Sequence, residues 1–487
     1  MYEDLEKAIA VPGASSLIES FRSIGYNLET AVADIIDNSI SAGAKHVWID
    51  RQWRGEHSII TIKDDGCGMN RNELVQAMRP GAMSPKEARV STDLGRFGLG
   101  LKTASFSQCR KLTVLSRKTD FAPVYWTWDL DYVAQCNQWE LLRWIPDEFR
   151  GALDSMKHGT LVIWTDLDRI LPAGTHAEDS VAHARFSSML EKVKKHLAMT
   201  FHRFIEDGSV RLYWCGHEIE AWNPFCTKES KTQEKSTDSL PGGVAVKGYI
   251  LPHKSNFSSE QAYQQAEGVK GWPAQQGFYV YRGKRLLLAG EWLGLRRKEE
   301  HLKLVRIQVD IPNSMDSQWQ IDIKKSKAYP PDNCIDQLKA YATACCQEGE
   351  RVFRHRGKII RQRAGQDFQP LWLEKKKDNA WYFVVNRDHG IIKQVKEMAK
   401  NNPDKAIETL LKFIEEGIPS KAIYINSSKN EESQKTPYCD TDPNLIKEML
   451  RKVYDNQLAD GQTPDQAKDY LKGMEPFNIY EDLIDEL

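Results

Sequence analysis

Acidic and amide side chains lie one turn apart on a predicted helix close to the N-terminus. In the stretch LETAVADIIDNSISA, residues 28–42, apolar residues recur at helical spacing, and Asp34 precedes Asn38 by four positions. Asn38 offers a neutral oxygen to Mg2+, and the polar stripe with Asp34 and Asp37 can hold the ion and a base side by side. The pattern predicts a divalent-cation site with a neighbouring base. The alternative is an amphipathic helix with a solvated acidic face.

A second segment combines a carboxylate with two glycines. In IKDDGCGM, residues 62–69, a predicted strand runs into Asp64, and Gly66 and Gly68 follow. Glycines let the backbone turn sharply and approach a flat ligand closely. A carboxylate directly before them can accept a hydrogen bond from an exocyclic amine. A plain turn between a strand and a helix gives the same local pattern and stays open as an alternative.

A third segment is rich in glycine and precedes a predicted helix. In GRFGLGLKTAS, residues 95–105, Gly95, Gly98 and Gly100 are followed by Lys102. Free backbone N–H groups at such a helix start bind phosphate, and the lysine adds a point charge. The order is neither GxGxxG nor GxxxxGK[ST], so a dinucleotide fold and a P-loop are both disfavoured. A flexible hinge is the alternative.

A fourth segment, HGTLVIW at residues 158–164, opens an apolar strand with Thr160. The hydroxyl of Thr160 is placed to share a polar network with Asp64. By itself this threonine predicts little, and its weight comes from its order relative to the other three segments.

The elements that must position these residues predict a mixed α+β chain. Strands are expected within residues 46–50, 58–65, 111–117, 123–130 and 159–167, with a helix near 71–78. Residues 79–100 form a long loop, which in a compact domain is usually functional. Beyond residue 170 we expect a helix at 179–200, strands within 209–214, 242–251, 276–288 and 304–311, and a helix near 332–350. Residues 227–242 are expected to be a surface loop.

Composition bounds the function classes. At 487 residues the chain is long enough for two or three domains. Its 67 basic and 68 acidic residues give a net charge of −1, which excludes a globally basic nucleic-acid coat. No run of about 18 apolar residues is present, so no membrane span is expected. The nine cysteines include no CxxC pair, which predicts reduced thiols in a cytoplasmic protein rather than a disulfide frame or a zinc site.

Taken in order and spacing, the four segments resemble the motifs of the GHKL ATPases, the superfamily of DNA gyrase, MutL, MORC proteins, Hsp-type chaperones and histidine kinases. The resemblance is strong over residues 10–170 and implies a GHKL (Bergerat) ATPase sandwich at 23–170 that binds ATP and Mg2+. It implies that Asp34 is the base and that Asn38 is the metal ligand. The nucleotide-binding residues that it implies are Asn38, Asp64, Gly68, Met69, Gly95, Gly98, Leu99, Gly100, Lys102 and Thr160.

The following part, residues 171–350, resembles the transducer (S5-like) domain of gyrase, MutL and MORC proteins, with MORC-like bacterial proteins as the nearest likeness. There a loop lysine reaches the γ-phosphate, and the resemblance implies that role for Lys324 or Lys325, with Lys327 third. Two positions depart from the family pattern: Asp34 stands where a glutamate is usual, and Ser41 where an aspartate is frequent. The shorter arm of Asp34 must still reach the attacking water.

The resemblance implies an ATP-gated homodimeric clamp, with residues 1–22 as a dimerisation strap. Residues 351–487 are expected to be a basic helix followed by a mainly helical accessory region. A helix over 351–363 would align four cations on one face, Arg351, Arg354, Lys358 and Arg361. That stripe favours duplex DNA bound without regard to sequence, in genome maintenance or defence, together with a nuclease or another defence protein as partner. A chaperone-like or regulatory ATPase acting on a protein client is the alternative.

Overall fold

The computed structural model describes residues 12–81, 100–316, 318–322, 328–354, 372–377, 380–389, 392–393, 396, 399–420, 422–424, 438, 441–472 and 480–487. The chain divides into two compact units, Met1–Phe353 and Arg354–Leu487. The expected α+β class is confirmed, since sheets and helices both contribute to the structure. None of the helices in these described ranges is long and apolar enough to cross a membrane.

The first unit contains a seven-stranded sheet with the order β4-β3-β5-β2-β1-β6-β7. Its paired neighbours are antiparallel except for β1 and β6, which run parallel. The strands are β1 (His46–Gln52), β2 (Ile59–Asp64), β3 (Lys111–Arg117), β4 (Val124–Asp129), β5 (Gly159–Thr165), β6 (Arg211–Trp214) and β7 (His217–Glu218). The sheet therefore continues past residue 170, where the sequence placed the end of the first domain.

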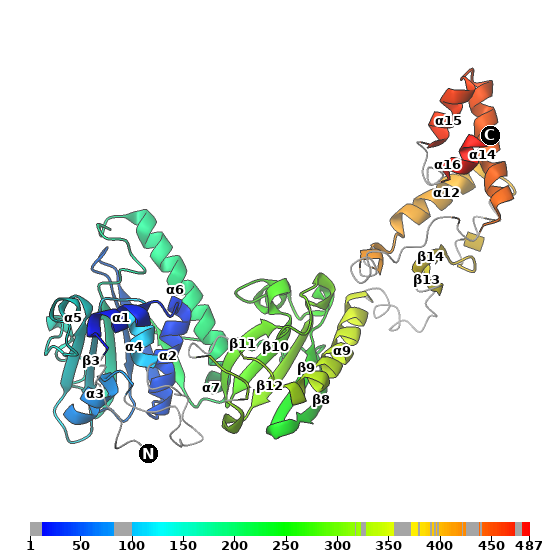
Figure 1. Cartoon of the computed structure of the whole chain (residues 1–487). Helices are drawn as coiled ribbons and strands as arrows, with labels where there is room; N and C mark the ends of the chain where they lie inside the picture. The colour runs from blue at the N-terminus through cyan, green and yellow to red at the C-terminus, as the bar shows by residue number, and fades with distance from the viewer. Residues whose placement is uncertain are drawn as a thin grey trace, which may run out of the picture. The chain divides into compact units, whose positions relative to one another are not determined.

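Helices cover one face of this sheet. They are α1 (Ala14–Arg22), α2 (Leu28–Ser41), α3 (Arg71–Met78), α4 (Gly100–Phe106), α5 (Leu130–Cys136), α6 (Ser180–Thr200) and α7 (His202–Glu206). Figure 1 shows α1, α2 and α4 together on that face, and the apolar stripe of α2 packs with β1 and β2 in one core. Part of the other face is covered by Ile145 and Leu153, from the connection between α5 and β5. The result is a helix-on-sheet sandwich.

A five-stranded sheet with the order β11-β10-β12-β9-β8 forms the rest of the first unit. Its strands are β8 (Gln233–Leu240), β9 (Val244–Ile250), β10 (Gly277–Arg282), β11 (Arg285–Glu291) and β12 (Val305–Ile311). The long helix α9 (Asp332–Arg354) buries Leu338, Ala342 and Cys346 against it, and α8 (Glu260–Ala266) adds Ala266 to the same core. Beta10 pairs with β11 in an antiparallel hairpin and with β12 in parallel.

The expectation of a surface loop at residues 227–242 was wrong, because β8 lies within it. Beta8 is an edge strand that pairs with β9, and most of its side chains are exposed. An edge strand with solvent on its faces needs no alternation of apolar residues, and polar residues protect such an edge from other chains. Hydrophobic periodicity therefore carries no signal for β8.

The second unit holds the short hairpin of β13 (Trp372–Lys377) and β14 (Ala380–Val385). Its helices include α12 (Pro403–Glu416), α14 (Pro443–Ala459), α15 (Pro464–Lys472) and α16 (Glu481–Asp485). Ile446, Leu450, Leu471 and Ile484 form a small core between the last three. This region is mainly helical, as expected, and the hairpin is an addition that the sequence did not indicate.

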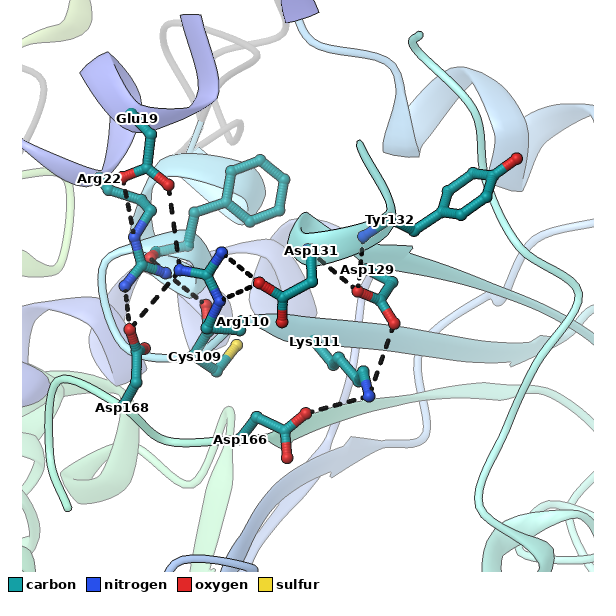
Figure 2. A network of polar contacts seen from close by, with 11 residues as sticks. Glu19, Arg22, Cys109, Arg110, Lys111, Asp129, Asp131, Tyr132, Asp166 and Asp168 are labelled. Carbon is teal, nitrogen blue, oxygen red and sulfur yellow. Dashed lines mark hydrogen bonds and ion pairs between the residues drawn. The ribbon is translucent and has the colours of Figure 1, made fainter. Parts of the chain in front are cut away.

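A charged network joins α1 to the rest of the first unit. Figure 2 shows Arg22 between Glu19 and Asp168, with Arg110 beside it. The guanidinium of Arg22 is buried, donates to the carbonyls of Phe106 and Cys109 at 2.9 and 3.0 Å, and lies 2.5 Å from Asp168. Phe106 is the last residue of α4, so Arg22 satisfies carbonyl groups at the end of that helix.

We predict that Arg22→Ala lowers the free energy of unfolding by about 2 to 3 kcal/mol, because it removes buried hydrogen bonds to a charged donor. Arg110→Ala is the matched control in the same network. Arg110 pairs with Asp131 at 2.6 Å, but a quarter of its side chain is exposed, so its loss should cost less than about 1 kcal/mol. Urea denaturation of the three proteins measures the difference. Equal losses in the two variants would contradict this account of Arg22.

Candidate functional site

Helix α2 carries the first group of predicted site residues. Asn27 caps its N-terminus, since the side-chain oxygen accepts from the amide of Thr30 at 2.9 Å. Asp34 is only 3% exposed and Asp37 only 1%, whereas Asn38 is exposed. The alternative of a solvated acidic face is therefore wrong, because both carboxylates lie inside the protein. The amide of Asn38 remains accessible one turn from Asp34.

The buried carboxylate of Asp34 is held from two sides. The hydroxyl of Tyr26 donates to its Oδ2 at 2.7 Å, and Nη2 of Arg285 lies 3.7 Å from its Oδ1. Burial, followed by the charge of Asp34, raises the pKa of the Tyr26 hydroxyl, which stays a hydrogen-bond donor. Asp37 pairs more closely with Nε of Arg285, at 3.2 Å. Sequence reasoning missed Tyr26 and Arg285; Arg285 lies far along the chain, and no local pattern marks it.

Asp64 stands at the end of β2, as predicted, and is tied to α2. Ser39 donates from Oγ to its Oδ2 at 2.8 Å, and the amide of Gly66 donates to its Oδ1 at 2.9 Å. Burial raises the pKa of this carboxyl, while the hydrogen bond from Ser39 acts in the opposite direction. Ser39 fixes the orientation of the carboxylate and was not singled out from the sequence. The sequence feature that could have identified Ser39 is its position next to Asn38, on the side of the helix that faces the sheet.

Gly68 lies where only glycine fits. Its φ is 65°, and a Cβ atom there would stand 1.8 Å from the carbonyl oxygen of Arg117. The next residue, Met69, donates its amide to Oγ of Ser116 at 2.9 Å, and Ser116 also contacts the hydroxyl of Thr160 at 3.0 Å. Ser116, which sequence reasoning missed, therefore links two predicted residues.

Thr160 is the register partner of Asp64 across the β2–β5 pair, so the predicted proximity of these two residues is confirmed. The hydroxyl of Thr160 bonds to Ser116, and the backbone of Thr160, rather than its hydroxyl, contributes a hydrogen bond to the carboxylate of Asp64. The second and fourth segments thus form one polar network at the end of the central strands.

The described part of helix α4 starts at Gly100, within the third segment, where a helix was predicted. A Cβ atom on Gly100 would lie 3.8 Å from Oδ2 of Asp34, so the first turn of α4 approaches the acid of α2. Lys102 is buried, and its Nζ donates to the carbonyl oxygen of Ala77 in α3 at 2.9 Å. Burial lowers the pKa of Lys102 to about 8. Gly95, Gly98, Leu99, Lys324, Lys325 and Lys327 lie outside the described residues.

Comparison with known protein families identifies a family model that matches the part of the chain with this site. Residues 26–160 match the family model of the Histidine kinase-, DNA gyrase B-, and HSP90-like ATPases. This part of the chain is a GHKL ATPase domain. The match begins at Tyr26, which bonds to Asp34, and ends at Thr160, so it encloses the first three segments and reaches the threonine of the fourth.

Known proteins that are similar to the chain match it over a limited stretch. ATPase morc-1 of Caenorhabditis elegans is 33% identical over 89 residues, which are 18% of this chain and 10% of that protein. DNA mismatch repair protein MutL of Aeromonas salmonicida is 37% identical over 94 residues, and MutL of Escherichia fergusonii is 35% identical over 94. Each MutL match covers 19% of this chain and 15% of the relative. The matched stretch thus spans a small part of each relative, and the similarity is confined to a part of the chain.

Within the GHKL domain the buried lysine yields a pH prediction. The pKa of Lys102 falls from the ordinary value of 10.5 to about 8, so between these values the unfolded chain binds more protons than the folded one. Stability therefore rises with pH across that window as the cost of the buried charge is relieved. We expect the stability difference between Lys102→Met and the wild type to shift by about 3 kcal/mol in favour of the wild type from pH 8 to 10.5.

Urea denaturation at several pH values measures this shift. Lys195→Met, at an exposed position on α6, is the control for the loss of one lysine charge. A pH-independent difference between Lys102→Met and the wild type would show that Lys102 stays fully protonated in the folded protein.

Proposed function

We propose that the chain is a Mg2+-dependent ATPase that closes as a homodimeric clamp on duplex DNA. The observation that carries the ATPase part is α2 itself, where a buried carboxylate and an exposed amide stand one turn apart within the GHKL domain. A solvated helix would leave both side chains exposed. Here Asp34 is held by Tyr26, while Asn38 stays accessible to a ligand.

The residues at the end of β2 fit an adenine ring. Both oxygens of Asp64 already accept hydrogen bonds from Ser39 and Gly66, which fix the plane of the carboxylate. A carboxylate has about four lone-pair sites, so it can still accept a bond from an exocyclic amine. Gly68, whose backbone packs against Arg117, and the half-buried Met69 would shape the same pocket.

The phosphate side fits Mg2+ as a partner of the nucleotide rather than as a metal held by protein alone. Asn38 would give one oxygen ligand, and Mg2+ usually takes the rest from phosphates and water. When bound, the ion neutralises charge on the phosphates. Asp34 would orient water or accept its proton, and the first turn of α4 would present N–H groups to phosphate.

We predict opposite defects from two neighbouring substitutions on α2. Asn38→Ala should lose Mg2+-dependent ATP binding, because it removes the metal ligand. Asp34→Asn should keep ATP binding and lose about 100-fold or more in hydrolysis, because the base is gone while the shape remains. Binding of a fluorescent ATP analogue and phosphate release measure the two effects. Glu29→Gln, in the first turn of the same helix, is the control. Wild-type ATP affinity in Asn38→Ala would contradict the site.

The clamp part of the proposal is supported by the relatives and by the charge of the chain. The similar proteins include one named a DNA mismatch repair protein. Arg351, near the end of α9, is exposed and is the first of the four cations of the predicted stripe. Lys358 and Arg361 lie outside what the structure describes, and so does the side chain of Arg354. The strap was predicted at residues 1–22, of which 1–11 lie outside what the structure describes. Because α1 packs into the core of the first unit, we propose that the part before α1 exchanges between two copies.

We predict that a non-hydrolysable ATP analogue doubles the mass of the protein and makes it retain duplex DNA. Deletion of residues 1–11 should prevent the doubling and leave ATP binding intact. Reversing the charges of Arg351, Arg354, Lys358 and Arg361 should abolish DNA retention, because phosphate contacts supply sequence-independent affinity. Light scattering and gel retardation at several salt concentrations measure these effects.

The same charge-reversed protein should hydrolyse ATP at the wild-type basal rate. If it retains DNA as the wild type does at moderate salt, the DNA proposal fails. A protein client then becomes the better hypothesis for the clamp. A mass that does not change with nucleotide would contradict ATP-gated dimerisation.

A further inference from the structure

The two-residue turn between β10 and β11 is flanked by two arginines. Arg282 and Arg285 are register partners at the end of the hairpin, and Gly283 and Lys284 form the turn between them. Gly283 has a φ of 59°, which a tight two-residue turn requires. Both arginines are buried, although they stand at the end of a sheet where solvent would be expected. Their burial shows that this turn is packed against other elements.

Arg285 reaches from the second sheet to the acids of α2. Its Nε lies 3.2 Å from Oδ2 of Asp37, and its Nη2 lies 3.7 Å from Oδ1 of Asp34. Its Nη1 donates to the carbonyl of Leu286 at 2.7 Å, which fixes the guanidinium to its own strand. The side chains are 4% exposed for Arg285, 3% for Asp34 and 1% for Asp37. The second sheet thus contacts the candidate base through a buried ion pair.

The charge balance of this cluster depends on Arg285. Two carboxylates three residues apart on one helix face repel each other, and burial strengthens that repulsion. His196 on α6 interacts with Arg285 and Asp37, but burial, followed by the charge of Arg285, lowers its pKa to about 3, so it is neutral at physiological pH. Removing the guanidinium would leave two buried charges without this partner.

The other arginine of the turn is anchored toward the segment with the candidate lysines. Nε of Arg282 donates to both carboxylate oxygens of Asp316, at 2.9 and 2.8 Å. Asp316 precedes Lys324 by eight residues in the sequence. One short turn therefore bonds on one side to the helix of the candidate base and on the other to the chain that leads to Lys324.

We propose that Arg285 is a positioning residue through which the second sheet controls hydrolysis at α2. This inference rests on the proposed ATPase function. With the turn in place, the guanidinium holds Asp37 and leaves the carboxylate of Asp34 oriented between Tyr26 and Gly100. Displacement of the turn removes the cation, so the two acids repel each other and Asp34 loses its orientation toward water. Hydrolysis then depends on the position of the second sheet, whereas adenine binding at Asp64 does not.

Lys284 offers a matched control in the same turn. Its Nζ pairs with Asp207, after α7, so it also links the hairpin to the first part of the unit. Among the described residues it makes no contact with the acids of α2, and about half of its side chain is exposed. A general loosening of the hairpin would follow from either substitution, but loss of the α2 contact follows only from substitution of Arg285.

The test uses the full chain with Arg285→Ala, Arg285→Lys and Lys284→Ala. Titration of a fluorescent ATP analogue gives the affinity, and phosphate release at saturating ATP gives kcat. For Arg285→Ala we expect kcat to fall by about 10- to 100-fold with an affinity close to that of the wild type. Arg285→Lys keeps the charge and should recover part of the loss. Lys284→Ala should match the wild type in both measurements.

A double variant separates charge repulsion from loss of folding. Asp37→Asn removes one of the two buried charges, so Arg285→Ala combined with Asp37→Asn should have a higher kcat than Arg285→Ala alone. If Arg285→Ala does not fold, Arg285→Lys carries the test through its lower kcat at unchanged affinity.

Wild-type kcat in the Arg285 variants would overturn the inference, as would equal losses in the Arg285 and Lys284 variants. A wild-type chain that neither binds nor hydrolyses ATP would instead sink the proposed function itself. The two failures are therefore distinguishable, because the first appears only in the variants and the second already appears in the wild type.

Discussion

Burial of carboxylates on and beside α2 is the constraint on which the rest of the first unit depends. Asp34, Asp37 and Asp64 are each less than a tenth exposed. A buried charge loses its hydration, which costs on the order of several kcal/mol. It is therefore tolerated only where a partner compensates for that cost. The partners come from different places: the segment before α2, the helix itself and β11. Satisfying these acids therefore fixes where those elements lie.

Local patterns predicted the elements of the site well. The apolar spacing of residues 28–42 corresponds to α2, the DxGxG sequence starts at the last residue of β2, and α4 lies at the end of the glycine-rich segment. Each of these signals lies within one element or one turn, so hydrophobic periodicity and glycine content suffice to find them. The GHKL motifs added their order along the chain, and the family match over residues 26–160 confirmed that interpretation.

Contacts between distant segments could not be predicted in the same way. Arg285 is separated from Asp37 by 248 positions, and Arg22 from Asp168 by 146. Nothing in the sequence around either arginine distinguishes a buried ion pair from a solvated charge. Beta6 joins the first sheet after the long helix α6. Because of this crossover, the sheet includes strands beyond residue 170, where the end of the first domain was expected. Strand β8 could not be predicted either, because its residues are mostly polar and its pairing with β9 is visible only in the structure.

The contacts of α4 bring its N-terminal end close to the buried acid of α2. Arg22 bonds to the carbonyl of Phe106 at the end of the helix, and Lys102 bonds to the carbonyl of Ala77 in α3. These two contacts hold α4 so that Gly100, which has no side chain, lies next to Oδ2 of Asp34. A Cβ atom at position 100 would stand 3.8 Å from that oxygen, in ordinary van der Waals contact. The approach of α4 to the acid of α2 is therefore set by contacts at the C-terminal end of α4 and with α3, and not by the glycine alone.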